Sequence, residues 1–62
     1  MKYQGKFNFS GQVITLYTDA KSKSRAYYNF ITRLSKMVNY STQFLKSYFV
    51  FYKNNYNIME VK

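Results

Sequence analysis

The sequence predicts a small α+β domain in which an antiparallel sheet packs on two helices, in the order ββααβ, over residues 1–62 as a single domain. Near both ends of the chain, apolar and polar residues alternate with a period of two, which is typical of strands with one buried face. In the middle of the chain, apolar residues recur every three or four positions, as on one face of a helix. Eight Tyr and six Phe supply most of the apolar surface for a core that has no Cys to link it.

The first expected strand covers residues 2–9. Its apolar side consists of alternate residues: Tyr3, Gly5, Phe7 and Phe9. Ser10-Gly11 follows and suits a two-residue hairpin turn, because Gly adopts positive φ at little cost. Residues 12–18 are rich in β-branched and aromatic side chains, so they form the second strand.

A two-residue turn also fixes the register of this hairpin. It pairs Phe9 with Gln12, Phe7 with Ile14 and Gly5 with Leu16. Ile14 and Leu16 then share a face with the apolar residues of the first strand. The opposite face is expected to carry Gln4, Lys6, Asn8, Val13, Thr15 and Tyr17. The two strands therefore agree on one core side.

The first helix is expected to begin at a cap formed by Thr18 or Asp19. Its apolar stripe has helical spacing: Tyr27, Phe30, Ile31, Leu34 and Val38. The opposite face is polar: Arg25, Asn29, Thr32, Arg33 and Lys36. Asn39 tolerates the left-handed conformation and is the expected end of the helix.

The second helix is expected to begin at a Ser41 cap. Its apolar positions are again helically spaced: Phe44, Leu45, Tyr48, Phe49 and Tyr52. Residues 49–52 have strand propensity too, and a turn at Asn54-Asn55 would then give the alternative order ββαββ. Residues 56–61 read as a closing strand beside the N-terminal hairpin.

The composition of charged residues excludes most kinds of catalytic and metal-binding site. Ten Lys and Arg stand against two acids, with no His and no Cys, so the formal net charge is +8. The two acids, Asp19 and Glu60, are far apart in the sequence. General acid–base catalysis and metal binding need clustered carboxylates, His or Cys. We therefore expect no catalytic residue, no metal and no cofactor, and we expect a binding protein with a polyanionic partner instead of an enzyme.

No membrane partner is expected, because the longest apolar run, residues 48–52, is far shorter than the ~20 residues of a membrane span. Met1 is not followed by the apolar region of a secretory signal. More than half of the residues are of types with AT-rich codons, which favours an AT-rich genome. Small basic proteins of this kind are common in phages and mobile elements, so we expect a phage or mobile-element protein located in the cytoplasm of a host cell.

Residues 31–50 resemble a helix-turn-helix. Leu34, Val38, Tyr40, Leu45 and Tyr48 fall at positions that are apolar in that motif, and Asn39 falls at the turn position usually given to Gly. The stretch from Leu34 to Phe49 is also similar to the corresponding part of AraC-type regulators. The resemblance implies duplex DNA as the partner, with a second helix that enters the major groove.

The resemblance assigns two groups of nucleic-acid-binding residues. Those facing the bases would be Ser41, Thr42, Gln43, Lys46 and Ser47. Those contacting phosphates would be Arg25, Arg33 and Lys36. Lys21 and Lys23 join the second group, because they lie at the helix end where positive charge is unfavourable, which indicates a purpose other than stability.

Two alternatives stay open. Lys6, Thr15 and Tyr17 on the outer face of the sheet could stack unpaired bases of DNA or RNA. The chain could instead be a phage-encoded inhibitor that binds a host enzyme or defence complex through its basic, aromatic surface. A homodimer is compatible with any of these interpretations.

Overall fold

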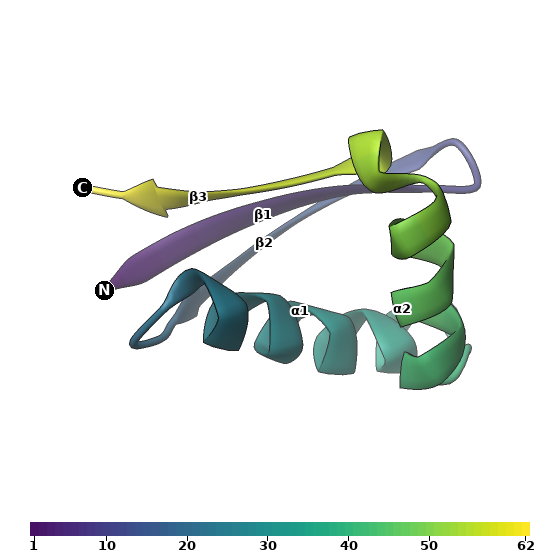
Figure 1. Cartoon of the computed structure of the whole chain (residues 1–62), viewed down its shortest axis with the longest axis horizontal. Coiled ribbons are helices and arrows are strands. Elements are labelled where there is room, and N and C mark those ends of the chain that lie inside the picture. Colours follow the sequence, from purple (N-terminus) through teal and green to yellow (C-terminus); the bar gives the residue numbers. More distant parts are fainter.

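The computed structural model describes residues 1–62 and has the predicted order ββααβ (Figure 1). Its elements are β1 (Lys2–Phe9), β2 (Gln12–Asp19), α1 (Lys23–Val38), α2 (Thr42–Phe51), a short 3-10 turn η1 (Lys53–Asn55) and β3 (Tyr56–Val61). The three strands form one antiparallel sheet in the order β2-β1-β3. The alternative order ββαββ is wrong, because residues 42–51 are helical.

The hairpin has the predicted turn and register. Ser10 and Gly11 both have positive φ, 52° and 81°, as a two-residue turn between twisted strands requires. Phe7 lies opposite Ile14 and Gly5 lies opposite Leu16. Because side chains alternate across a strand, this register gives the sheet one buried and one exposed face.

Helix α1 begins later than predicted. Its N-cap is Ser22, whose hydroxyl accepts a hydrogen bond from the Arg25 N–H at 3.3 Å. The predicted cap at Thr18 or Asp19 is wrong, because the ladder between β1 and β2 continues through those residues and ends with an Ala20 N–H bond to the Met1 carbonyl. The chain therefore turns between Ala20 and Ser22 before α1 begins at Lys23.

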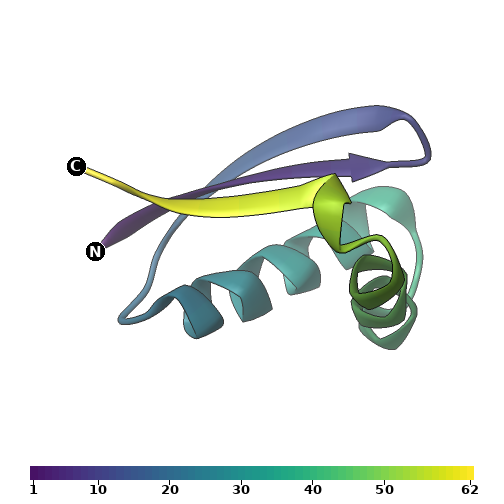
Figure 2. The same cartoon turned by 45° about the horizontal axis from the view of Figure 1, so that its top comes forward.

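The other helix boundaries follow the sequence. Asn39 ends α1 in the left-handed conformation, with φ 62°, and its N–H donates to the Ser35 carbonyl. Ser41 caps α2 by accepting from the Phe44 N–H at 3.1 Å. Three residues therefore connect the helices. α1 runs beneath the sheet, and α2 crosses the end of α1 beside the hairpin instead of lying alongside it (Figures 1 and 2).

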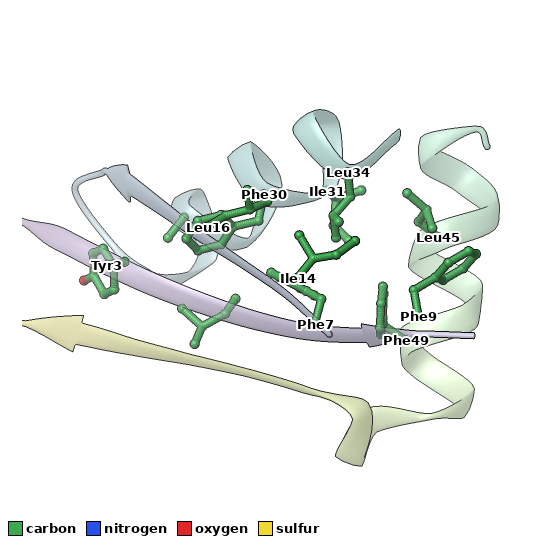
Figure 3. Close-up of a cluster of buried hydrophobic side chains, with 12 residues drawn as sticks. Tyr3, Phe7, Phe9, Ile14, Leu16, Phe30, Ile31, Leu34, Leu45 and Phe49 are labelled. Carbon is green, nitrogen blue, oxygen red and sulfur yellow. The ribbon is translucent and has the colours of Figure 1, made fainter. Parts of the chain in front are cut away.

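Twelve buried apolar residues form the core between the sheet and the helices (Figure 3). Phe7 is at its centre: its ring meets Phe30 edge-on at 5.6 Å and Phe49 at 5.4 Å, and stacks on Tyr56 at 5.8 Å. The second helix completes the core with Leu45 and Phe49, which are 0% and 1% exposed. Five of the twelve core residues are aromatic, and the rings of Phe30 and Phe49 meet that of Phe7 at the centre of the core.

Candidate nucleic-acid interface

Positive charge is concentrated in the helical half of the molecule. Residues 20–59 contain no Asp or Glu, so α1, α2 and the segments around them carry cations only. The two acids lie at the end of the sheet where both termini are found (Figure 1). A polyanion that approaches the helices therefore meets no carboxylate on either of them.

The fold does not join the two acids into a pair. Asp19 lies opposite Lys2 and Glu60 lies opposite Tyr3, on strands at the two edges of the sheet. Consecutive residues of β1 point to opposite faces, so the two carboxylates are on opposite faces as well. No cluster of three His, Cys, Asp or Glu side chains is present that could hold a metal ion.

Four of the residues assigned to phosphate contact are exposed, and their side chains make no hydrogen bond within the protein. They are Lys21, Lys23, Arg25 and Lys36. The first three gather at the start of α1, and Lys36 lies in its last turn. At 1.5 Å per residue, Arg25 and Lys36 are roughly 16 Å apart along the helix axis. The cations are therefore spread over the whole length of α1.

Arg33 has a structural partner. Its guanidinium Nη1 donates a hydrogen bond to the Tyr17 carbonyl at the edge of β2, and Asn29 Nδ2, one turn earlier, donates to Thr18 Oγ1 at 3.2 Å. Arg33 thus fixes α1 against β2. This contact gives Arg33 a role in folding, because a charged donor meets a carbonyl that the sheet leaves unpaired.

The residues assigned to base contact are on or beside the first two turns of α2. Thr42, Gln43 and Ser47 are exposed, whereas the Ser41 hydroxyl is occupied by the cap of the helix. Lys46 is half-buried: its Nζ lies over the Tyr28 ring at 4.2 Å from the centroid. Lys46 therefore links α2 to α1 and does not project freely to solvent.

Tyr28 is the residue of this surface that the sequence analysis missed. It lies outside the apolar stripe of α1 and is 61% exposed, between Arg25 and the ammonium group of Lys46. An exposed ring between two cations can stack on a base or pack against a sugar. The sequence feature that could have indicated Tyr28 is an aromatic residue that directly follows Tyr27 and falls outside the helical spacing of the apolar stripe.

A row of aromatic side chains runs along one side of α2. Successive members are four residues apart, and we call them the aromatic ladder: Tyr40, Phe44, Tyr48 and Tyr52. Neighbouring centroids are 4.9, 6.4 and 4.8 Å apart. Three of these rings were predicted to be core, yet Phe44 and Tyr52 are 46% and 49% exposed. Phe51 stacks on Tyr52 at 5.2 Å and is 81% exposed, and Val50 is 75% exposed.

The outer face of the sheet carries fewer cations. Tyr17 accepts a hydrogen bond from Gln4 Nε2 at 2.9 Å, and Lys2 Nζ lies 5.6 Å from its ring centroid. Lys6 and Thr15 are exposed on the same face, as predicted. Asp19 shares this face, so it is less uniformly positive than the helical side.

One tyrosine has a shifted pKa. Burial between α1 and β3, and next the charge that Tyr56 acquires on ionising, raise the pKa of Tyr27 above its usual 10.0. The two rings are 5.6 Å apart at their centroids. Tyr27 is therefore neutral in any interaction near neutral pH.

Comparison of the chain with protein-family models, with curated proteins and with solved structures found no match. Neither α1 nor α2 combines the length and apolar character that crossing a bilayer requires.

Proposed function

We propose that the protein binds nucleic acid, duplex DNA in the first place, through the surface formed by α1 and the first half of α2. The observation that carries the proposal is the acid-free helical half, with four exposed cations free of internal partners on or beside α1. In this proposal those cations hold backbone phosphates. Phosphate contacts supply most of the affinity and position the protein without reading sequence.

The connection between the helices supports a helix-turn-helix arrangement. A three-residue link, a left-handed Asn39 and a second helix that crosses the first are typical of that motif. The sheet occupies the side of α1 that an additional helix covers in a three-helix bundle. Thr42, Gln43 and Ser47 are then the residues available to read bases, and Gln pairs well with adenine.

Salt dependence tests the proposal directly. Each phosphate contact contributes about −0.9 to the slope of log affinity against log salt, so four free cations give a slope of roughly −4 on duplex DNA. Fluorescence anisotropy with a random duplex at several salt concentrations measures this slope. Absence of binding at low salt would contradict the proposal.

Two matched variants distinguish the effect of where the cations lie from the effect of net charge on DNA affinity. One replaces Lys23, Arg25 and Lys36 by Gln, and the other replaces Lys2, Lys6 and Lys62 by Gln. Each removes three positive charges, the first from α1 and the second from the sheet and the C-terminus. We expect the first variant to lose most of the affinity and about three-quarters of the salt slope, and the second to lose much less. Equal losses would mean that net charge alone attracts the DNA.

Base reading needs its own comparison. On a DNA site selected from a random pool, Gln43→Ala should cost about 1–3 kcal/mol and relax the sequence preference, with little effect on random DNA. Lys36→Ala should weaken both complexes equally and reduce the slope by about one phosphate. If no site can be selected, or if the two variants behave alike, α2 does not read sequence.

A second candidate function is favoured by the exposed end of α2. Phe51 is 81% exposed and stacks on Tyr52 of the aromatic ladder, and exposed apolar surfaces of this kind mark protein contacts. In this second proposal, the chain is a phage or mobile-element protein that inhibits a host enzyme or defence complex in the cytoplasm. Recovery of one host protein by the wild type after nuclease treatment, but not by Phe51→Ser, would support it over DNA binding.

A further inference from the structure

The hydrogen-bond pattern of the sheet leaves the outward main-chain groups of the edge strand β3 without partners. In an antiparallel sheet, the main-chain groups of successive residues point alternately to the strand on one side and to the strand on the other. The Ala20 N–H donates to the Met1 carbonyl at 2.9 Å, so odd-numbered residues of β1 bond to β2 and even-numbered residues bond to β3. The partners of the latter are Asn57, Met59 and Val61. The amide and carbonyl groups of the alternate β3 residues, Tyr56, Ile58 and Glu60, therefore point away from the sheet.

The two edges of the sheet are treated differently. On β2, Arg33 bonds to the outward Tyr17 carbonyl, and Asn29 from the same helix holds the Thr18 side chain. The outward main-chain groups of Val13 and Thr15 on β2 have no partner. On β3, no side chain or loop bonds to the outward groups of the strand. Edge strands are usually protected by Lys, Pro or a bulge, and β3 has none of these.

A groove lies beneath the open edge. It has a volume of about 420 Å³ between α1 and β3, and its lining is mostly aromatic and apolar: Lys23, Ser24, Tyr27, Tyr28, Tyr56 and Ile58. Side chains of a strand added to β3 would alternate, and those on the inner face would enter this groove. The site therefore offers both main-chain hydrogen bonds and apolar contact.

We propose that β3 pairs with β3 of a second copy of this chain, antiparallel about a twofold axis at Ile58. In this register Ile58 faces its own counterpart, and Tyr56 faces Glu60 of the second copy. All three residues with outward groups are then paired, through roughly six hydrogen bonds. The two three-stranded sheets become one sheet of six strands, and Ile58 and Tyr56 of the second copy enter the groove.

Charge favours β3 as the contact between two copies. The chain has a formal charge of +8, so most of its surface repels a second copy. β3 carries no cation, and its only charged residue is Glu60. Two copies of β3 therefore bring no cations face to face, whereas the β2 edge carries Arg33 at the Tyr17 carbonyl. Because repulsion between the remaining cations opposes association, added salt should tighten the dimer.

The test is the effect of a proline on the oligomeric state. Glu60→Pro removes an N–H that no group within one copy uses, so the β1–β3 ladder stays intact. Glu60→Gln removes the same charge and keeps the N–H. In sedimentation equilibrium over a range of concentrations, we expect the wild type and Glu60→Gln to form dimers. Glu60→Pro should stay monomeric, with at least a tenfold weaker association.

Hydrogen exchange of the wild type keeps the proposal testable if the proline variant does not fold. Protection of the Ile58 and Glu60 amides should rise with protein concentration, whereas the outward Thr15 and Tyr17 amides of β2 should not change. A protein that stays monomeric at every concentration would overturn the proposal and leave the edge to another protein. A dimer with unchanged β3 protection would overturn it too. Neither measurement involves DNA, so the outcome is independent of the proposed nucleic-acid function.

Discussion

Gly5 occupies the position of the sheet where a single methyl group has the largest predictable effect. A Cβ atom built on Gly5 would lie 2.7 Å from Cε2 of Phe7 and 2.8 Å from Cε2 of Phe30. Ordinary contacts of a Cβ begin at about 3.4 Å, so the rings would have to move by more than half an ångström. Gly5→Ala should therefore strain the centre of the core.

The rings have little room to move. Phe7 and Phe30 are both 0% exposed, and Phe7 is held on its other sides by Phe49 and Tyr56. Inserting a methyl group into such a core costs about 1–3 kcal/mol. The lower chain entropy of Ala in the unfolded state offsets about 0.4–1 kcal/mol of this. We expect a net loss of about 1–2 kcal/mol from a total stability of roughly 3–9 kcal/mol for 62 residues.

The loss is measured by urea unfolding at constant m value and by thermal unfolding followed by circular dichroism. A domain of this size loses about 4–8 °C in Tm for each kcal/mol. Gly11→Asn is the control, because nothing lies within 4 Å of a Cβ there and Asn tolerates the φ of +81°. The double variant Gly5→Ala/Phe30→Leu should recover part of the loss by making room. Unchanged or increased stability of Gly5→Ala would refute the close approach of the two rings.

Three further outcomes are expected. Arg33→Ala should lower the free energy of unfolding by about 1 kcal/mol, because it leaves the Tyr17 carbonyl without its donor. The control Arg25→Ala should change it by no more than about 0.5 kcal/mol. Equal values for the two variants in urea unfolding would contradict the structural role of Arg33. The raised pKa of Tyr27 contributes stability that is complete below pH 10 and is lost as the pH rises through the folded-state pKa. Tyr27→Phe should therefore lose less stability above pH 10 than the wild type. The control variant Tyr28→Phe, at an exposed tyrosine, should follow the wild type. The pure protein should not nick supercoiled DNA, because its two acids lie on opposite faces; nicking that a single Tyr→Phe substitution abolishes would show an enzyme after all.

Local features of the chain were predictable from the sequence because they depend on residues within a few positions of one another. The alternation in residues 2–9 and the Ser10-Gly11 turn together determine the register of the hairpin. The spacing of apolar residues determines the buried face of α1 and the buried positions Leu45 and Phe49 of α2. Asn39 and Ser41 determine where one helix ends and the other begins. The N-cap was missed because continued pairing with β1, which is not a local property, extends β2 to Asp19.

The contacts between side chains from different elements are decided by the tertiary structure. The sequence shows ten cations, but only the packing of α2 across α1 brings Lys46 over Tyr28, and only the packing of α1 against β2 brings Arg33 to the Tyr17 carbonyl. The order β2-β1-β3 likewise makes β2 and β3 the edge strands, and the packing of α1 gives one carbonyl of β2 a partner while the outward groups of β3 have none. Periodicity gives the face on which a side chain lies, but its partner depends on how distant elements cross, and no local pattern encodes that.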